Sequence, residues 1–201
     1  FLGGNGANPI DKPGLASMTL DLLQQGTKSR TATQFADQLA QIGADLRTTT
    51  TNDSAYMTFT SLKSRYAQLL DLVADATMNP TFPDAELERE RQSRLGTLTE
   101  QRENPSAIAD KVLAVALHGT PSPYGYARVG TESSIRSMKA EDLRAYWSQN
   151  MVPNNAALVV SGDISAAELR SFLDTAFSKW AAGIVKPPDR GTVQQTSARV
   201  V

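Results

Sequence analysis

Cysteine is absent from the 201 residues, and histidine occurs only once, at His118. Without cysteine the chain cannot form a disulfide, offer a thiolate nucleophile or bind zinc through sulfur. A catalytic zinc ion usually takes three protein ligands, and imidazole is the commonest of them. The remaining donors are carboxylates, which suit magnesium or calcium better than zinc. The composition therefore disfavours a zinc enzyme.

A charge excess and a long apolar run are absent as well. Because 20 basic residues balance 21 acidic ones, there is no electrostatic reason to expect nucleic acid or an anionic membrane as a partner. No apolar run approaches the ~20 residues that span a bilayer, and no signal peptide opens the chain. The chain opens without a methionine, so we expect a mature or excised piece of a longer polypeptide, and any targeting signal could have been lost with the missing part. A periplasmic or otherwise extracytoplasmic location in a bacterium is weakly favoured; the lack of cysteine is compatible with an oxidising compartment but does not require one.

Hydrophobic periodicity and capping patterns predict helices and strands in an irregular order. Helices are expected from Pro13 to Gly26 and over residues 31–43, 62–79, 84–102, 105–118, 140–149 and 165–177. Alternation predicts a hairpin over residues 44–60, and the apolar run 156–160 predicts a buried central strand. Since no regular βαβ order appears, we expect an α+β two-layer sandwich, with helices covering a largely antiparallel sheet. Residues 1–201 should form a single domain, with residues 181–201 as a linker and the start of a following strand.

Short motifs along almost the whole chain resemble one family of domains. They are Gly14-Leu15-Ala16, Gly26-Thr27, Gly43-Ala44, Asp75-Ala76, Asn79-Pro80-x-Phe82, Glu86-x-Glu88-Arg89, Asn104-Pro105, Pro123-Tyr124-Gly125 and Ser161-Gly162-Asp163. Each is unspecific alone, but their order, from about Gly14 to Trp180, resembles the pitrilysin/insulinase family of zinc metallopeptidases. The fold that this resemblance implies, a sheet covered by helices, agrees with the pattern of elements.

Active members of that family carry His-x-x-Glu-His on the first helix. The two histidines bind zinc, and the glutamate acts as general base toward the metal-bound water. The resemblance places Ser17 and Asp21 at the histidine positions and Leu20 at the glutamate position. The motif is therefore degenerate in this chain.

A third zinc ligand, a glutamate, lies further along the chain in active members. Counting forward from Asp21 by the family's spacing reaches Thr97. Counting back from Asn104-Pro105 reaches Thr97 too, or Gly96 as the less favoured choice. The resemblance thus implies that all three ligands and the base are replaced. We predict no catalytic residue, no metal ligand and no cofactor in this chain, with zinc expected only in a homologous catalytic half.

The replacements offer little chemistry of their own. Ser17 and Asp21 lie one helical turn apart and could share a hydrogen bond. A hydrolytic serine needs a base, usually histidine, between itself and the acid. His118 ends another predicted helix and has no sequence reason to reach Ser17. We therefore interpret this helix face as polar and unreactive.

Other polar and aromatic residues have structural interpretations. His118 is expected to be a surface or capping residue at a helix end. Three carboxylates at alternate positions, Glu86, Glu88 and Glu90, are interleaved with Arg89 and Arg91, which favours a solvated, salt-bridged face over a cation site. The two tryptophans, Trp147 and Trp180, should lie in the core or at an interface, and Tyr124 should be structural.

The predicted strand from Ser54 to Ser61 is a candidate for substrate contact. In active relatives, the resemblance implies, the equivalent strand lies beside the zinc and pairs with extended substrate. Such edge pairing holds peptides through backbone hydrogen bonds with little sequence preference. Tyr56, Thr58 and Thr60 share one face and could line a substrate chamber. The alternative, that this is simply a solvated sheet face, stays open.

The resemblance implies a non-catalytic domain of a clamshell-shaped peptidase. Such a domain would complete the substrate chamber and help to hold peptide for zinc in a homologous half or subunit. Its expected partners are that homologous catalytic zinc-binding domain or subunit and a peptide substrate. Two alternatives remain: a purely structural or interaction subunit with no peptidase role and, less favoured, an active zinc metalloendopeptidase.

Overall fold

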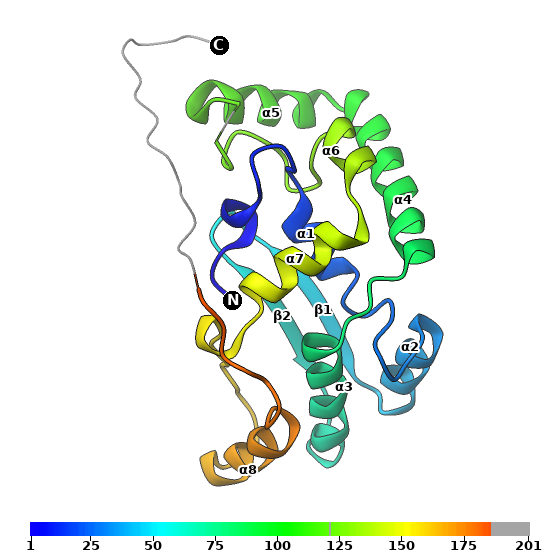
Figure 1. Ribbon diagram of the computed structural model, residues 1–201, viewed down its shortest axis with the longest axis vertical. Coiled ribbons are helices and arrows are strands. Elements are labelled where there is room, and N and C mark those ends of the chain that lie inside the picture. The colour runs from blue at the N-terminus through cyan, green and yellow to red at the C-terminus, as the bar shows by residue number, and fades with distance from the viewer. Residues whose placement is uncertain (121, 186–201) are drawn as a thin grey trace.

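The computed structural model describes residues 1–120 and 122–185 (Figure 1). These residues form a mostly helical α+β fold with a small antiparallel sheet. The helices are α1 (Leu15–Asp21), α2 (Ala32–Gln41), α3 (Tyr66–Met78), α4 (Asp84–Arg102), α5 (Pro105–His118), α6 (Glu132–Ser137), α7 (Ala140–Asn150) and α8 (Ala166–Ala176). The strands are β1 (Asp45–Thr50) and β2 (Ala55–Thr60), and short 3-10 turns cover Gly4–Ala7, Lys63–Arg65 and Pro153–Asn155.

The hairpin predicted over residues 44–60 is confirmed. Strands β1 and β2 pair antiparallel, with Asp45 opposite Thr60 and Thr50 opposite Ala55. Side chains alternate between the two faces of a strand, and the burial of this hairpin follows that period. One face packs against helices, with Ala55 and Thr50 buried, whereas the other face is exposed along both strands.

Two apolar clusters support this arrangement. The first joins α1 to α4, α6 and α7 and includes Leu20, Ile135 and Leu143, each 1% exposed or less. The second joins α2 and α3 to the hairpin through Phe35 and Leu69, among others. Helix α1 packs against β1, β2 and α7, so the helix that carries the degenerate motif lies between the sheet and the helical layer.

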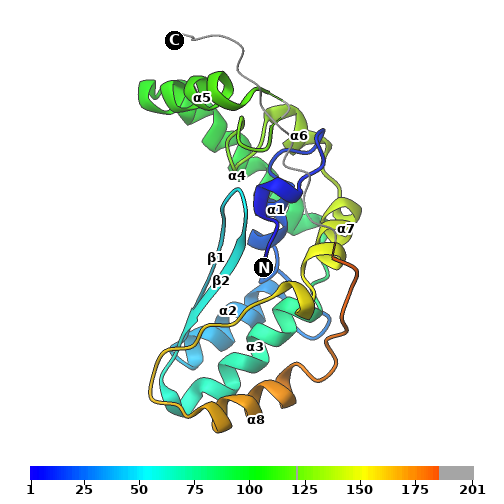
Figure 2. The ribbon, with the colours of Figure 1, turned by 90° about the vertical axis from the view of Figure 1, so that its left-hand side faces the viewer.

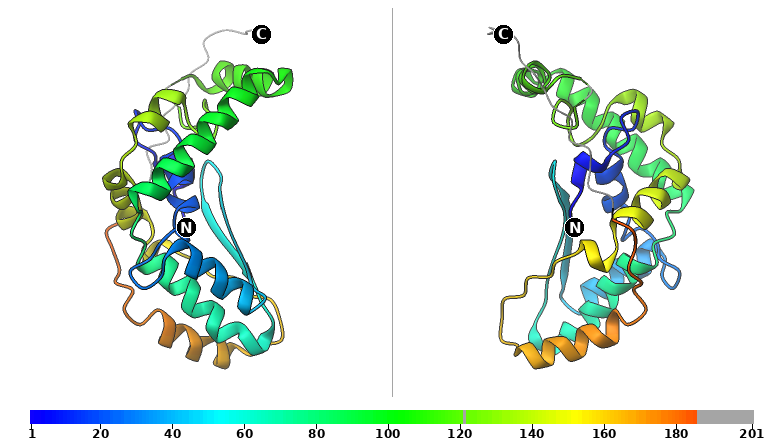
Figure 3. Two further views of the ribbon diagram at one scale, coloured as in Figure 1. Left: turned by 90° about the vertical axis from the view of Figure 1, so that its right-hand side faces the viewer. Right: turned by 60° about the vertical axis from the view of Figure 1, so that its left-hand side comes forward.

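The molecule is curved. Figures 2 and 3 show the exposed face of the hairpin on the concave side, with α2 and α3 behind it and α5 reaching over one end. The exposed face of the hairpin therefore lies on the concave side of the molecule.

The prediction of a central strand at residues 156–160 is wrong for the described structure. These residues belong to no strand, Leu158 and Val159 are 44% and 90% exposed, and residues 157–160 make no hydrogen bond to any other described residue. An apolar run becomes a strand only where a neighbour completes its ladder, and no such neighbour lies beside it in the described structure. The predicted large sheet is therefore a two-stranded hairpin in residues 1–120 and 122–185.

The remaining boundaries largely follow the sequence. Capping boxes begin α2 at Thr31 and α8 at Ser165, as predicted. Helix α1 ends at Asp21 rather than near Gly26, because the backbone tightens there: the N–H of Leu23 bonds to the carbonyl of Leu20, three residues back. Residues 181–185 have no regular structure, and the strand expected at the end of the chain lies outside the described residues.

Candidate functional site

Helix α1 begins at a close approach between two backbones. Gly14 caps it with φ 87°, and a Cβ at this position would lie 2.7 Å from the carbonyl oxygen of Val129. Only glycine combines that dihedral angle with so little space. The loop ending at Gly130 is further held by Ser134, whose hydroxyl donates to the carbonyl of Pro13 over 2.7 Å. This contact places the carbonyl of Arg128 2.7 Å from Ser17 Oγ, which donates to it.

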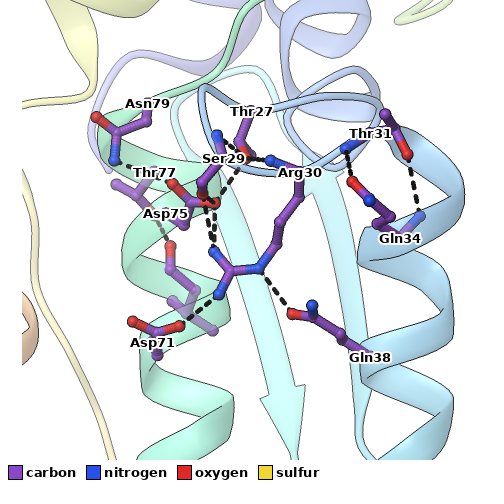
Figure 4. Close-up of polar contacts among 11 residues, drawn as sticks. Thr27, Ser29, Arg30, Thr31, Gln34, Gln38, Asp71, Asp75, Thr77 and Asn79 are labelled. Atoms are coloured by element: carbon purple, nitrogen blue, oxygen red, sulfur yellow. Dashed lines mark hydrogen bonds and ion pairs between the residues drawn. The ribbon is translucent and has the colours of Figure 1, made fainter.

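The segment after α1 is fixed by a buried carboxylate on α3 (Figure 4). Asp75 accepts hydrogen bonds from the hydroxyls of Thr27 and Ser29, at 2.6 and 2.7 Å, and from the guanidinium of Arg30 at 2.6 Å. Burial alone would raise the pKa of Asp75, but these bonds and one from Asn79 outweigh it and hold the pKa below its usual value. A charged, fully paired carboxylate thus ties the segment between α1 and α2 to α3.

Arg94 of α4 lies beside the degenerate motif. Its side chain is only 6% exposed. Its guanidinium donates to Asp21 Oδ2 at 2.5 Å, to Ser17 Oγ at 2.8 Å and to Glu90 Oε1 at 2.8 Å. A buried cation therefore binds Ser17 and Asp21, which the resemblance aligns with the histidine pair, and the carboxylate of Glu90.

The polar residues of the degenerate motif share one cavity of about 320 Å³. Ser17, Asp21 and Thr97 all line it, together with Arg94. Leu20, which the resemblance places at the position of the base, does not line the cavity, because it is 1% exposed and belongs to the apolar cluster around α1. The structure thus brings together three of the four motif positions that the sequence singled out.

The electrostatics of this cavity are those of a cation shared by two acids. Burial raises the pKa of Asp21; the attraction of Arg94 opposes this rise, and the nearby Glu90 adds to it. Thr48 of β1 donates a hydrogen bond of 3.3 Å to Asp21. Two arginines, Arg94 and Arg128, and two acids, Asp21 and Glu90, line the cavity, so there is no excess of positive charge with which to bind an anion.

Comparison with known proteins identifies the family. The sequence profile described as "Insulinase (Peptidase family M16)" matches residues 3–127, more than half of the chain, and "Peptidase M16 inactive domain" matches residues 137–201. The chain belongs to peptidase family M16. The resemblance seen in the sequence is thereby confirmed.

Among curated M16 relatives, the "Non-peptidase homolog YmxG" of Helicobacter pylori is 25% identical over 178 residues, covering 89% of this chain and 41% of its own length. The "Uncharacterized zinc protease YmxG" of Bacillus subtilis is 24% identical over 183 residues, which cover 87% of this chain and 43% of that protein. The crystal structure of a "peptidase M16 inactive domain" from Pseudomonas fluorescens superposes with a TM-score of 0.86 at 25% identity, over 92% of this chain and 45% of that one. The chain spans less than half the length of each.

The zinc that the M16 fold implies does not fit the residues present here. The motif positions supply two hydroxyls, one carboxylate and a leucine, and the guanidinium of Arg94 lies among them. Zinc sites are built from imidazole, thiolate and carboxylate ligands. Within the described part of the chain, no three such side chains are arranged to hold a metal ion. Nor is any described helix of this M16 chain long and apolar enough to cross a membrane.

The strand beside this M16 site is β1, which the sequence did not single out. Thr48, Thr49 and Thr50 line the cavity with Arg94. Tyr56, Thr58 and Thr60 do not line it; they lie on β2, on the exposed face of the hairpin. In register, Tyr56 faces Thr49 and Thr58 faces Arg47, so the two strands share that face.

The other candidates have structural partners. His118 ends α5 and its ring lies 5.5 Å from that of Tyr124. Trp147 packs against the cluster around α1 and donates to the carbonyl of Thr77, and Trp180 packs on Phe177.

The carboxylates of α4 divide into two groups. Glu86 and Glu88 form ion pairs with Arg89 and Arg91, as expected of a salt-bridged face. Glu90 instead pairs with the buried Arg94 and so belongs to the site.

Arg94 is the residue that sequence reasoning missed. It follows the charged run 88–91 in the sequence and resembles one more solvated arginine. Its position carried a signal: it lies seven residues after Leu87 and four before Leu98, on the face of α4 that meets the cluster around α1. A charged residue on such a face is buried with its partners.

Proposed function

We propose that this chain is a non-catalytic M16 domain that walls a peptide-holding chamber. It helps to hold peptide for zinc bound in a homologous half or subunit. The observation that carries this proposal is the buried guanidinium of Arg94, which binds Ser17 and Asp21 where active relatives place their histidine pair.

The chemistry of the site supports a non-catalytic role. Zinc-dependent hydrolysis needs a metal that polarises water and a base that receives its proton. Leu20 offers no proton acceptor at the base position. Asp21 is already paired with Arg94, and a fixed cation repels a second one at close range.

The shape of the domain supports a role as a chamber wall. The exposed face of the hairpin, which carries Tyr56, Thr58 and Thr60, forms the floor of the concave side (Figures 2 and 3). Tyr56 is 51% exposed there. Hydroxyl groups and one aromatic ring suit weak, sequence-tolerant contact with peptides.

Exposed apolar side chains on helix α5 support the proposal of a partner domain. Ile108, Val112 and Leu113 are 47%, 45% and 53% exposed, and no described residue of this helix is buried. A helix with apolar side chains around its circumference is normally covered on all sides. Because the M16 relatives are more than twice as long as this chain, a homologous half is the covering partner we propose.

Peptide binding tests the proposal. Unstructured, fluorescently labelled peptides are titrated with the chain, with Thr58→Glu and with Gln68→Glu, whose site lies on the exposed surface of α3. Both variants add one negative charge. We expect Thr58→Glu to weaken the binding of acidic peptides about fivefold, since a like charge on the exposed face of the hairpin costs roughly 1 kcal/mol. Gln68→Glu should leave the binding unchanged.

The same titration separates the alternatives. If the chain binds no peptide, or if both variants behave alike, the purely structural subunit is the better reading. If the chain alone cleaves the peptides in a zinc-dependent way, it is an active metallopeptidase and the proposal fails.

A further inference from the structure

Arg128, on the loop between α5 and α6, is held in place by backbone groups rather than by an acid. Its Nη1 donates to the carbonyl of Thr50, at the end of β1, over 2.7 Å. Its own carbonyl accepts from Ser17, so both the backbone and the side chain of this residue are fixed. In the part of the chain that the structure describes, no Asp or Glu forms an ion pair with Arg128. Arg94, by contrast, pairs with two carboxylates.

Arg128 also lines a second, larger cavity of about 590 Å³ at the turn of the hairpin. This cavity adjoins the one around Arg94, because Thr50, Arg128 and Val129 line both. The turn of the hairpin lies beside α4 (Figures 2 and 3), and Gln101 of α4 forms part of the wall. Its volume is within the range of ligand pockets in proteins.

The second cavity offers hydrogen-bond donors and no acid. Arg128 is the only charged residue among the described residues that line it, and Gln101 and Asn52 contribute side-chain amides. Neither amide forms a hydrogen bond with another described residue. Asp53 follows Asn52 in the sequence but does not line the cavity, and its carboxylate accepts a hydrogen bond from Tyr124. The described lining therefore carries one positive charge and two spare amides.

We propose that this second cavity binds a carboxylate of the peptide that the domain holds, with Arg128 as the residue that recognises it. A guanidinium can pair with a carboxylate through two parallel N–H···O bonds. Arg128 keeps the N–H groups for such a pair, because within the described structure its side chain makes only the bond from Nη1 to Thr50. The amides of Gln101 and Asn52 add neutral donors for the carboxylate or for neighbouring peptide groups.

The inference rests on the peptide-holding role proposed above and adds a substrate class to it. That class is peptides with an acidic residue or a free carboxyl terminus. The cavity around Arg94 does not compete for this group, since Asp21 and Glu90 already pair with its guanidinium and would repel a third carboxylate. An acidic group is therefore directed to the second cavity.

Three fluorescent peptides of one sequence, labelled at the amino terminus, test the assignment. The first has one glutamate and an amidated carboxyl terminus. The second has glutamine in its place and a free carboxyl terminus, and the third has glutamine and an amidated terminus. We expect the third to bind about tenfold more weakly than the tighter of the other two, because it lacks the charge-assisted pair. Whichever of the first two binds more tightly identifies the carboxylate as that of a side chain or of the terminus.

Arg128→Gln should abolish this preference. It should weaken the binding of the preferred carboxylate peptide about tenfold and leave the third peptide unchanged. Arg170→Gln is the matched control, because it removes the same charge from the exposed surface of α8, at the opposite end of the molecule from α5 (Figure 1). It should change the affinity for any of the peptides by less than about twofold. Equal effects of the two substitutions would mean that net charge alone causes the preference, and would overturn the proposal.

Two substitutions of Gln101 give a result that a folding defect cannot imitate. Gln101→Glu places a competing carboxylate in the same cavity as Arg128 and should weaken the binding of the preferred peptide about tenfold, whereas Gln101→Lys should strengthen it about threefold. The two effects have opposite signs at one site. Effects of the same sign, or no effect of either, contradict a carboxylate in this cavity.

The peptide titrations separate this inference from the role on which it rests. If all three peptides bind equally tightly, the peptide-holding role stands and the carboxylate site is wrong. If none of them binds, both are wrong. Inorganic phosphate that displaces the preferred peptide at concentrations as low as those of the peptide itself would show a general anion site, and would also overturn the assignment to a peptide carboxylate.

Discussion

Arg94 of α4 and Asp21 of α1 lie 73 residues apart in the sequence, yet the guanidinium of Arg94 donates to Asp21 Oδ2 at 2.5 Å. Both residues line the same cavity. Arg94 is 6% exposed, whereas the Asp21 side chain is 42% exposed. The buried member of this pair is therefore the cation. It places a fixed positive charge beside Ser17 and Asp21, the two positions that the sequence resemblance aligns with the histidine pair of active members.

Removing that cation should destabilise the domain. Arg94→Ala leaves Asp21 and Glu90 facing each other without a counter-charge, and we expect a loss of about 2–3 kcal/mol in the free energy of unfolding. Arg89→Ala is the matched control, because Arg89 also pairs with a glutamate on α4 but is 67% exposed. It should cost at most about 0.5 kcal/mol. Urea unfolding measures both, and equal losses would show that Arg94 is an ordinary surface residue.

Restoring the zinc donors should fail while Arg94 remains. The restored chain carries four substitutions, Ser17→His, Leu20→Glu, Asp21→His and Thr97→Glu. We expect its zinc affinity to rise by about a hundredfold or more when Arg94→Ala is added, because the guanidinium repels a divalent ion at contact distance. Zinc titration by calorimetry compares the restored chain with and without Arg94→Ala, and circular dichroism verifies that both are folded. Equal affinities would mean that Arg94 does not occupy the metal position.

The glycine at the start of α1 should be indispensable for its geometry. Gly14→Ala places a methyl group 2.7 Å from the carbonyl of Val129 at φ 87°, and we expect a loss of about 2–3 kcal/mol. Gly43→Ala also has positive φ, at 61°, but meets nothing within 4 Å. Gly43→Ala should therefore lower the free energy of unfolding only by the cost of a left-handed backbone conformation, about 1 kcal/mol. Thermal unfolding of the two variants separates the clash from the dihedral angle, and similar losses would contradict the close approach.

Stability should fall in acid through Asp75. Its pKa is lowered in the folded state, so its contribution is fully present above the unfolded pKa and disappears as pH falls through the folded one. Asp75→Asn should therefore unfold more easily than the natural chain at neutral pH, by about 2 kcal/mol, and the difference should shrink below about pH 4. Asp71→Asn, at the 68% exposed partner of Arg30, is the control. A difference independent of pH would contradict this role for Asp75.

Much of the fold could be predicted from the sequence because local signals agree with it. Capping boxes at Thr31 and Ser165 and the alternation over residues 44–60 act within a few residues of themselves. The strand prediction for residues 156–160 failed because it depends on more than local signals. Its apolar composition is that of a central strand, but whether it pairs depends on a neighbour that its own residues do not specify.

The site was only partly accessible to sequence reasoning. The family resemblance singled out Ser17, Asp21 and Thr97, which share one cavity. The resemblance could imply what is missing from the motif, but not what lies there instead, since Arg94 comes from another helix and follows the charged run 88–91. Its burial follows from the packing of α4 on α1, which is a tertiary property.

The zinc content of this chain tests the central claim most directly. The purified chain is incubated with excess zinc, passed through a desalting column and analysed for metal, together with an active M16 enzyme as positive control. We predict far less than one zinc ion per chain and no peptide cleavage. One tightly held zinc ion per chain, lost on Asp21→Ala, would contradict the account.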